Sequence, residues 1–321
     1  MMHAIVARQA GGPDVLELAE VQRPVPGRGQ LLVKVSATGV NFIDTYKRSG
    51  TYKVQYPFTP GSEAAGTVEE VGEGVSVYSP GDRVATAEGT NCYAGYILVD
   101  EDKALPVPRG VDDFTAAALP LQGITAHYLI NSSFRVEPGH TVLLHAGAGG
   151  VGLLAIQLLK AKGVRVITTV STDDKAKLAR EAGADHVIRY DGFSAKVREL
   201  TDGTGADAVF DGVGKDTFDG SLAALRVRGT LVLFGAASGP VPPFDPQRLN
   251  AGGSLYLTRP TINHFLRNAQ ERRWRSDEIF AAAANGSLKV RIGGRYDLAH
   301  AARAHDDLEQ RRTTGKIVLV P

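Results

Sequence analysis

Residues 147–152 read Gly-Ala-Gly-Gly-Val-Gly, which has the spacing G-x-G-x-x-G. Residues 141–146 before this run are typical of a buried strand, and residues 153–161 after it are typical of a helix with one apolar face. Such a strand, turn and helix bind the pyrophosphate of a dinucleotide. Glycines permit a tight turn and the close approach of phosphate, and a helix N-terminus offers free N–H groups. We therefore predict a dinucleotide site that uses Gly147, Gly149, Gly150, Val151 and Gly152.

The residues after the next predicted strand bear on which dinucleotide is bound. In NAD sites an acidic residue at this point accepts hydrogen bonds from the ribose, whereas a basic group nearby accommodates the 2′-phosphate of NADP. The strand predicted over 164–170 is followed by Ser171, which can donate to phosphate, and Lys175 follows within one helical turn. This pattern favours NADPH over NADH. Asp173 and Asp174 weigh against it unless they stabilise the helix N-terminus, and Lys175 could also be a solvated helix lysine.

The sequence offers little of the chemistry that usually polarises a carbonyl. A catalytic zinc needs three protein ligands, and the chain has one cysteine, Cys92, and eight histidines without close ligand spacing. None of the ten tyrosines is followed four residues later by lysine. No metal site is therefore predicted. The expected acceptor takes hydride without strong electrophilic help, as a quinone or a conjugated enone does.

Two patterns along the chain predict the elements that hold these residues. Short strands between Gly and Pro turns fill roughly the first 120 residues, which is typical of a barrel or sandwich. After a short helix over 115–121 that ends near Gly123, strands and helices alternate, which predicts a parallel sheet covered on both faces. The expected strands of that sheet are 141–146, 164–170, 185–188, 207–210, 229–235 and 254–258. Helices near 262–273 and 276–285 and a strand over 316–320 complete the expected α/β fold.

Composition and charge narrow the class of protein. The chain has 321 residues, of which 43% are hydrophobic and 22% charged, as in an ordinary globular protein of about two domains. The 36 basic residues nearly balance the 35 acidic ones, so no nucleic-acid or anionic membrane partner is expected. No apolar run reaches the roughly 18 residues of a membrane span. A single cysteine fits a reducing, cytoplasmic location.

Several motifs in order resemble the medium-chain dehydrogenase/reductase superfamily, and within it the zinc-free quinone oxidoreductase branch related to ζ-crystallin. They lie at 39–46, 61–66, 80–84, 146–152, 234–235 and 258–260. The resemblance implies a GroES-like catalytic domain over 1–122, a doubly wound Rossmann domain that binds NADP(H) over 123–262, and a segment over 263–321 that returns to the first domain. It implies an active site in the cleft between the two domains. Asn41 and Ser62 stand where the zinc alcohol dehydrogenases of this superfamily carry a cysteine and a histidine ligand.

The resemblance also implies roles for individual residues. Asn41, Tyr46 and Tyr52 are the expected catalytic residues, with the amide of Asn41 able to hold a quinone oxygen or a cofactor group. Tyr46 could instead pack the barrel, and Asp44 could be structural rather than a ribose contact. Expected cofactor contacts in the first domain and the returning segment are Asn41, Phe42, Ile43, Asp44, Thr45, Tyr46, Arg311 and Lys316. Those in the Rossmann domain, besides the glycine turn, are Tyr128, Ser171, Lys175, Tyr190, Val213, Phe234, Ala237, Ser238, Thr258 and Arg259.

The function implied by the resemblance is an NADPH-dependent quinone reductase that forms a homodimer through the edge of its Rossmann sheet. Two alternatives stay open at this point. One is a reductase of enones or alkenals, which must also deliver a proton to the α-carbon, and the other is an NADPH-binding protein without catalytic activity. A tetramer is likewise an alternative to the dimer.

Overall fold

The computed structural model describes residues 1–321, and the chain forms two compact units. Unit 1 comprises Met1–Ile124 and Leu266–Pro321, so it is built from both ends of the chain. Unit 2 is the continuous segment Thr125–Phe265. The sequence-based boundaries lay after residues 122 and 262.

Unit 2 contains a six-stranded parallel sheet with the order β10-β9-β8-β11-β12-β13. Its strands are β8 (Thr141–Leu144), β9 (Arg165–Thr169), β10 (His186–Ile188), β11 (Ala206–Asp211), β12 (Leu225–Leu233) and β13 (Tyr256–Thr258). Because β8 lies between β9 and β11, the chain builds the sheet outward in both directions from β8. The predicted doubly wound sheet is confirmed, and each of its six strands falls within a predicted range or overlaps it.

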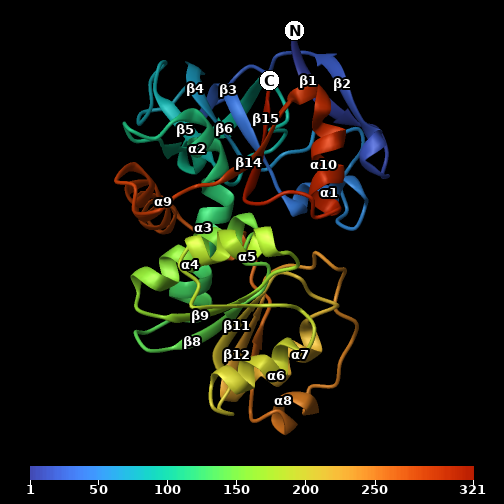
Figure 1. Ribbon diagram of the computed structural model, residues 1–321. Helices are drawn as coiled ribbons and strands as arrows, with labels where there is room; N and C mark the ends of the chain where they lie inside the picture. Colours follow the sequence, from blue (N-terminus) through green and yellow to red (C-terminus); the bar gives the residue numbers. More distant parts are fainter. The chain divides into compact units, whose positions relative to one another are not determined.

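Helices cover both faces of this sheet, because each parallel crossover needs one. Helices α4 (Gly150–Ala161) and α5 (Asp173–Glu181) lie on one face, and α6 (Phe193–Leu200) and α7 (Phe218–Ala224) lie on the other (Figure 1). A short helix, α8 (Gln247–Ala251), precedes β13. Buried apolar side chains such as Leu143, Ile167 and Val209 form a core between the sheet and its helices.

Unit 1 contains a seven-stranded sheet in which β3 pairs with β4, β6 and β15. Its strands are β3 (Gln30–Val40), β4 (Ala64–Val71), β5 (Arg83–Thr86), β6 (Tyr96–Asp100), β7 (Leu105–Pro106), β14 (Ile292–Asp297) and β15 (Lys316–Val320). A separate hairpin consists of β1 (Met2–Ala7) and β2 (Leu16–Val21). Helices α1 (Phe42–Arg48) and α10 (Ala301–Glu309) lie side by side although more than 250 residues separate them (Figure 1).

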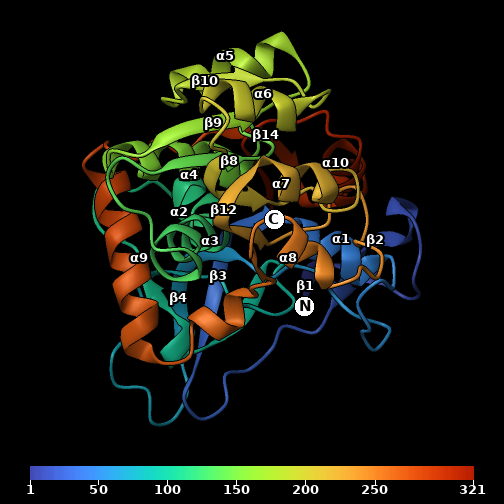
Figure 2. The same cartoon turned by 90° about the horizontal axis from the view of Figure 1, so that it is seen from below.

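Two predicted helix ends were wrong. The helix expected to stop near Gly123 is two helices, α2 (Asp113–Ala118) and α3 (Pro120–Tyr128), and α3 continues through Gly123. A Cβ atom at Gly123 would lie 2.8 Å from a methyl carbon of Leu119, so close packing explains the glycine. The two helices expected near 262–285 are a short 3₁₀ helix, Ile262–Phe265, and one longer helix, α9 (Ala269–Ala284), which Figure 2 shows without interruption. Asn268 begins α9 by accepting a hydrogen bond from the Glu271 amide at 2.8 Å.

Candidate functional site

The glycine turn connects β8 to α4 at the point where the sheet order reverses, which is where doubly wound sheets bind their ligands. Two of its glycines leave no room for a side chain. A Cβ atom at Gly147 would lie 2.2 Å from Oγ1 of Thr168, and one at Gly152 would lie 2.4 Å from the carbonyl oxygen of Ala146. The first amides of α4 have no acceptor within the helix. The turn therefore fits a diphosphate group.

A buried hydrogen-bond network lies directly before this turn. The ring of His145, 1% exposed, places Nδ1 2.8 Å from Oγ1 of Thr169 and Nε2 3.0 Å from Oγ of Ser221. The Ser221 hydroxyl donates to the Asp211 carboxylate at 2.8 Å, so Nε2 of His145 must donate to Ser221. The network joins β8, β9 and β11 to α7, and it fixes the strand from which the turn departs.

The same carboxylate shapes the loop after β11. Asp211 accepts hydrogen bonds from the backbone amides of Val213 at 2.8 Å and Gly214 at 3.0 Å. Val213 in turn accepts a hydrogen bond from the hydroxyl of Ser238, which follows β12. The predicted contacts Val213, Phe234, Ala237 and Ser238 thus lie together at the carboxyl ends of β11 and β12.

Burial of His145 gives an expected pH dependence of stability. Burial lowers the pKa of His145 to about 4, whereas an unfolded histidine titrates near 6.5. Between these pH values the unfolded chain binds a proton that the folded chain does not, so acidification favours unfolding by about 1.4 kcal/mol per pH unit. His305 in unit 1 adds a similar effect, since burial lowers its pKa to about 3. We expect the urea-unfolding free energy of His145→Gln to fall less steeply between pH 6.5 and 4.5 than that of the unchanged protein. Equal slopes would contradict this account.

The ribose end of the predicted cofactor site lies where β9 and β10 stop. Ile188 is the partner of Thr169 in the parallel register, and the Val170 amide donates to the Ile188 carbonyl at 3.0 Å. Ser171 follows Val170 at the end of β9, and Arg189 and Tyr190 follow β10 at the same end of the sheet. Nζ of Lys175 lies 3.4 Å from Oγ of Ser171. The predicted Ser171 and Lys175 are thus in contact, and Tyr190 lies after the neighbouring strand.

Sequence reasoning missed a second cation at this end. Arg189 donates to the carboxylate of Asp173, the first residue of α5, at 2.5 Å. The only available signal was its position directly after a predicted strand that neighbours the one before Ser171. Tyr190 itself stacks against the buried His145 ring, with 6.0 Å between the ring centres and 14° between their planes.

Three further predicted contacts in unit 2 lie near its last residues. Tyr128 is 3% exposed and stacks on Phe265, with ring centres 4.4 Å apart. Thr258 ends the edge strand β13, and the Arg259 guanidinium donates to the carbonyl of Pro260 at 3.1 Å. The packing on Phe265 accounts for the burial of Tyr128.

In unit 1, Asn41 belongs to a buried ionic cluster with Glu63 and Lys316. Nζ of Lys316 lies 2.6 Å from Oδ1 of Asn41 and donates to the carboxylate of Glu63 as well. Nδ2 of Asn41 donates to Glu63 at 2.9 Å, and the Leu121 amide donates to the other Glu63 oxygen at 2.7 Å. Burial lowers the pKa of the Lys316 ammonium, and Glu63 opposes that shift. All three side chains are at most 4% exposed.

This cluster bears on two predicted contacts. The side-chain amide of Asn41 is bonded on both sides within unit 1, to Glu63 and to Lys316. The Lys316 ammonium is buried between Asn41 and Glu63, so its charge is already paired inside unit 1. Arg311 is exposed after α10 in unit 1.

Asp44 lies in a second buried cluster. Its carboxylate accepts hydrogen bonds from the backbone amide of Asn41 at 3.0 Å, the Ser62 hydroxyl at 3.1 Å and the Tyr93 hydroxyl at 3.1 Å. Burial raises the pKa of Asp44. Asp44 is fully buried and its carboxylate is bonded to these donors, which fits the structural one of the two sequence interpretations.

The aromatic residues on and after α1 lie close to one another. The ring centre of Tyr46 lies 5.4 Å from that of Tyr52 and 6.2 Å from that of Phe42. Tyr52 is 43% exposed. Thr45 is buried and donates its hydroxyl to the Phe42 carbonyl at 2.8 Å, while Ile43 is partly buried. Phe42 and Tyr46 are half-buried, and the three rings are tilted to one another by 33° and 58°, so they form an aromatic cluster of which Tyr52 is the exposed member.

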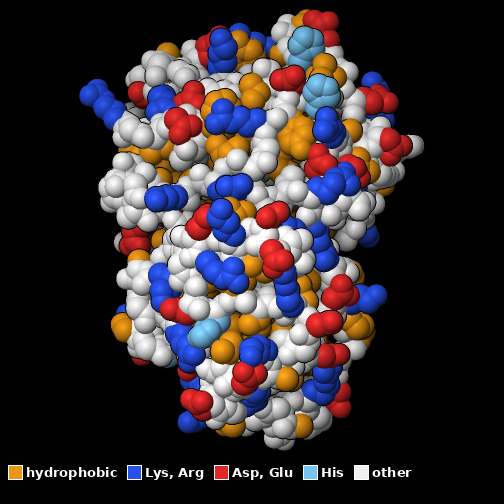
Figure 3. Space-filling model, viewed as in Figure 1, with side chains coloured by type: hydrophobic (Ala, Val, Ile, Leu, Met, Phe, Trp, Pro, Cys, Tyr) orange, Lys and Arg blue, Asp and Glu red, His pale blue; other side chains and the backbone are white.

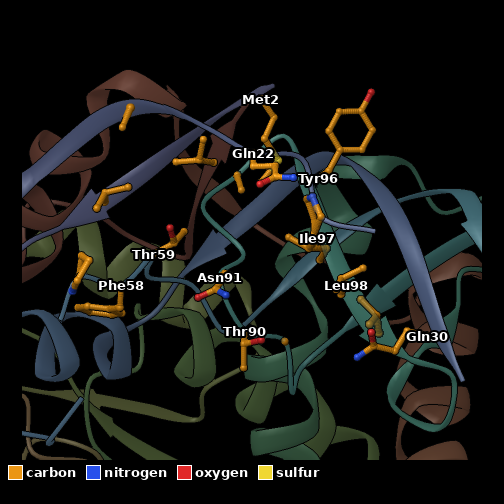
Figure 4. Close-up of a pocket in the computed structure, with 18 of the residues that line it drawn as sticks. Met2, Gln22, Gln30, Phe58, Thr59, Thr90, Asn91, Tyr96, Ile97 and Leu98 are labelled. Atoms are coloured by element: carbon orange, nitrogen blue, oxygen red, sulfur yellow. The ribbon is translucent and has the colours of Figure 1, made fainter. Parts of the chain in front are cut away.

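Unit 1 also contains a cavity of about 780 Å³, which Figure 4 shows. It lies between the β1–β2 hairpin and β6, and its walls include Gln22, Thr59, Asn91 and Tyr96. None of the predicted site residues lines it. Cys92 is a buried packing residue, and burial raises the pKa of its thiol well above the ordinary value.

Comparison with known proteins identifies the family to which the chain belongs. Residues 27–130 match the family model of the alcohol dehydrogenase GroES-like domain, and residues 150–281 match that of the zinc-binding dehydrogenases. A quinone oxidoreductase from Pseudomonas aeruginosa is 45% identical over 315 residues, with 97% of each chain covered. The chain belongs to the quinone oxidoreductase branch of the medium-chain dehydrogenase/reductase superfamily. A 2-haloacrylate reductase from Burkholderia is 40% identical, covering 100% of this chain and 99% of the relative.

A solved structure supports the family fold directly. The mycobacterial protein Rv1454c, complexed with NADPH, is 54% identical with a TM-score of 0.97 and full coverage of both chains. The predicted GroES-like and Rossmann architecture is thereby confirmed.

A catalytic zinc, which the name of one family model implies, does not fit the residues of unit 1. The Lys316 ammonium is bound between Asn41 and Glu63, and a metal ion there would be repelled by it. No group of three or more His, Cys, Asp and Glu side chains is placed to hold a metal ion.

No helix is both long and apolar enough to cross a membrane.

Proposed function

We propose that this protein is an NADPH-dependent quinone reductase that works without zinc. The observation that carries the proposal is the glycine turn of unit 2, where side chains are excluded at Gly147 and Gly152, together with the contact between Lys175 and Ser171 after the next strand. The relatives support it, because a family member 45% identical is a quinone oxidoreductase and a structural neighbour binds NADPH.

Different parts of the chain bind the cofactor and the acceptor in this proposal. NADPH, when bound, supplies the hydride. The first amides of α4 hold the diphosphate, and the loops after β11 and β12 support the rest of the cofactor. The faces of Tyr46 and Tyr52 orient a flat acceptor by stacking. A quinone suits such a site because its ring accepts hydride without a strong acid or metal beside it, so placement of the reactants and exclusion of water are the main contributions.

The test of this proposal is consumption of NADPH with 1,4-benzoquinone and with 9,10-phenanthrenequinone, before and after treatment with a chelator. We expect turnover with quinones that chelation does not change. A 2-alkenal and 2-chloroacrylate serve as comparison substrates, because one relative reduces 2-haloacrylate by its name. Turnover of the activated double bonds without turnover of any quinone would contradict the proposal, as would a requirement for zinc.

The cofactor preference has its own test at Ser171. Replacing Ser171 with aspartate places a carboxylate where a ribose hydroxyl would donate and where a 2′-phosphate would be repelled. We expect the preference for NADPH over NADH to fall by about tenfold or more, which corresponds to about 1.4 kcal/mol. Ser194→Asp on α6 is the matched control and should leave the preference unchanged. Ratios of kcat/KM for the two coenzymes measure the effect.

We further propose a homodimer that forms through the free edge of β13. This strand ends the six-stranded sheet, and Tyr256 on it is 61% exposed. An uncovered strand edge is a natural place for two copies to pair about a twofold axis. Light scattering coupled to size-exclusion chromatography distinguishes a dimer from a monomer or a tetramer.

The buried lone cysteine supports a cytoplasmic location. Basic and acidic side chains are interspersed on the face shown in Figure 3, which suits a small-molecule substrate.

A further inference from the structure

The ion pair between Arg189 and Asp173 has no role in the function described so far. We propose that Arg189 is a ligand of the cofactor's 2′-phosphate, and that Asp173 competes with this phosphate for the Arg189 guanidinium. The inference rests on the proposed use of NADPH and names the residues that set the strength of that preference.

Strand register places Arg189 at the ribose end of the site. Ile188 pairs with Thr169, so Arg189 leaves β10 beside the point where Val170 leads from β9 to Ser171. Asp173 follows Ser171 by two residues and begins α5. Since Arg189 donates to Asp173 at 2.5 Å, its guanidinium already lies over the segment that carries Ser171 and Lys175.

The exposure of the pair allows the guanidinium to change partners. The Asp173 side chain is 99% exposed and that of Arg189 is 45% exposed. Ion pairs between such exposed groups are weak, because water screens their attraction. A phosphate carries nearly twice the charge of a carboxylate and offers three oxygens, to which arginine can bond with two N–H groups at once. A 2′-phosphate would therefore draw Arg189 away from Asp173, and Lys175, in contact with Ser171, adds a second positive charge at this end of the sheet.

This arrangement also explains an acidic residue at the ribose end of a site for a phosphorylated ribose. Asp173 would repel a 2′-phosphate if it stood alone. Its pairing with Arg189 offsets this charge in the free protein, and once the phosphate has taken the guanidinium, the 99% exposed Asp173 carboxylate is screened by water and only weakens binding. NADH has no 2′-phosphate, so it gains nothing from Arg189, and the pair acts on the preference between the two coenzymes.

The test is calorimetric titration of the full chain with NADPH, NADH and 2′,5′-ADP, none of which requires turnover. We expect Arg189→Gln to raise the Kd for NADPH and for 2′,5′-ADP by about tenfold and to leave the Kd for NADH unchanged. Lys177→Gln, on the same helix as Asp173 but paired with Glu181, is the matched control for lost positive charge. Asp173→Asn should lower the Kd for NADPH by about threefold, more than Asp174→Asn, which removes the same charge one residue away without touching Arg189.

The outcomes separate this inference from the proposed function. If the unchanged protein prefers NADPH and Arg189→Gln keeps that preference, Arg189 is not a phosphate ligand. An equal loss of NADPH and NADH binding would show that Arg189 acts only on the fold, and it would overturn the inference too. An unchanged protein that binds neither coenzyme would overturn the proposed function and the inference together. Equal effects of Asp173→Asn and Asp174→Asn would overturn the competition by Asp173.

Discussion

Replacement of Gly152 by alanine is expected to weaken NADPH binding by about 100-fold or more. A Cβ atom there would lie 2.4 Å from the Ala146 carbonyl oxygen and 2.9 Å from two backbone atoms of Gly147, so the turn itself must open. Opening the turn withdraws amide donors from the diphosphate, and each lost hydrogen bond to a charged group weakens binding by roughly 1.5–3 kcal/mol. Two such losses account for the expected factor.

The fold should survive this change, because Gly152 lies within α4 and alanine favours a helix. Gly95→Ala in unit 1 is the matched control, since a Cβ atom there would be 3.8 Å from its nearest neighbour, the His3 carbonyl oxygen. Thermal unfolding checks whether both variants are folded, and titration with NADPH measures their affinity for the cofactor. A Gly152→Ala variant that bound NADPH within a few-fold of the unchanged protein would show that the diphosphate lies elsewhere.

Replacement of Lys316 by methionine is expected to destabilise the protein by about 3–5 kcal/mol. The change leaves the Glu63 carboxylate, which is fully buried, without its positive partner. Hydrogen bonds from Asn41 and Leu121 remain, but they cannot neutralise a charge removed from water. The double variant Lys316→Met with Glu63→Gln should recover much of the loss, because no charge is then buried.

An exposed ion pair provides the control for this prediction. Lys196 and Glu199 lie on α6 with side chains 45% and 66% exposed, and Lys196→Met should change stability by less than about 0.5 kcal/mol. Urea unfolding of the full chain compares the variants at one pH. If Lys316→Met and Lys196→Met proved equally mild, the charge of Lys316 would not be needed at this place in the fold.

The sequence was sufficient wherever the signal is local. The glycine turn, with its strand and helix, lies within about 20 consecutive residues, and the alternation of strands and helices defines the doubly wound sheet. Local patterns also made Ser171 and Lys175 candidates, and the structure brings them together.

The parts that were missed depend on contacts between distant residues. Lys316 and Glu63 are 253 positions apart, and a lysine before Ile-Val-Leu-Val resembles the exposed start of a strand. The bonds that commit the Asn41 amide could not be foreseen for the same reason. His145 was considered only as a metal ligand, yet its partners Thr169 and Ser221 lie on other elements. Helix ends were wrong at Gly123, because a glycine required by side-chain packing has the same sequence signature as one that ends a helix.

Unit 1 is built from two segments at opposite ends of the chain, and this affects how it folds during synthesis. Unit 2 is contiguous and can complete its sheet while synthesis continues. Unit 1 cannot, because β15 pairs with β3, and β14 with β15, only after residues 292–320 have left the ribosome. Until then the nascent chain presents an uncovered edge of β3 and a Glu63 carboxylate whose counter-charge has not been translated. Loss of β15, by a premature stop codon or by trimming, should therefore damage unit 1 far more than unit 2.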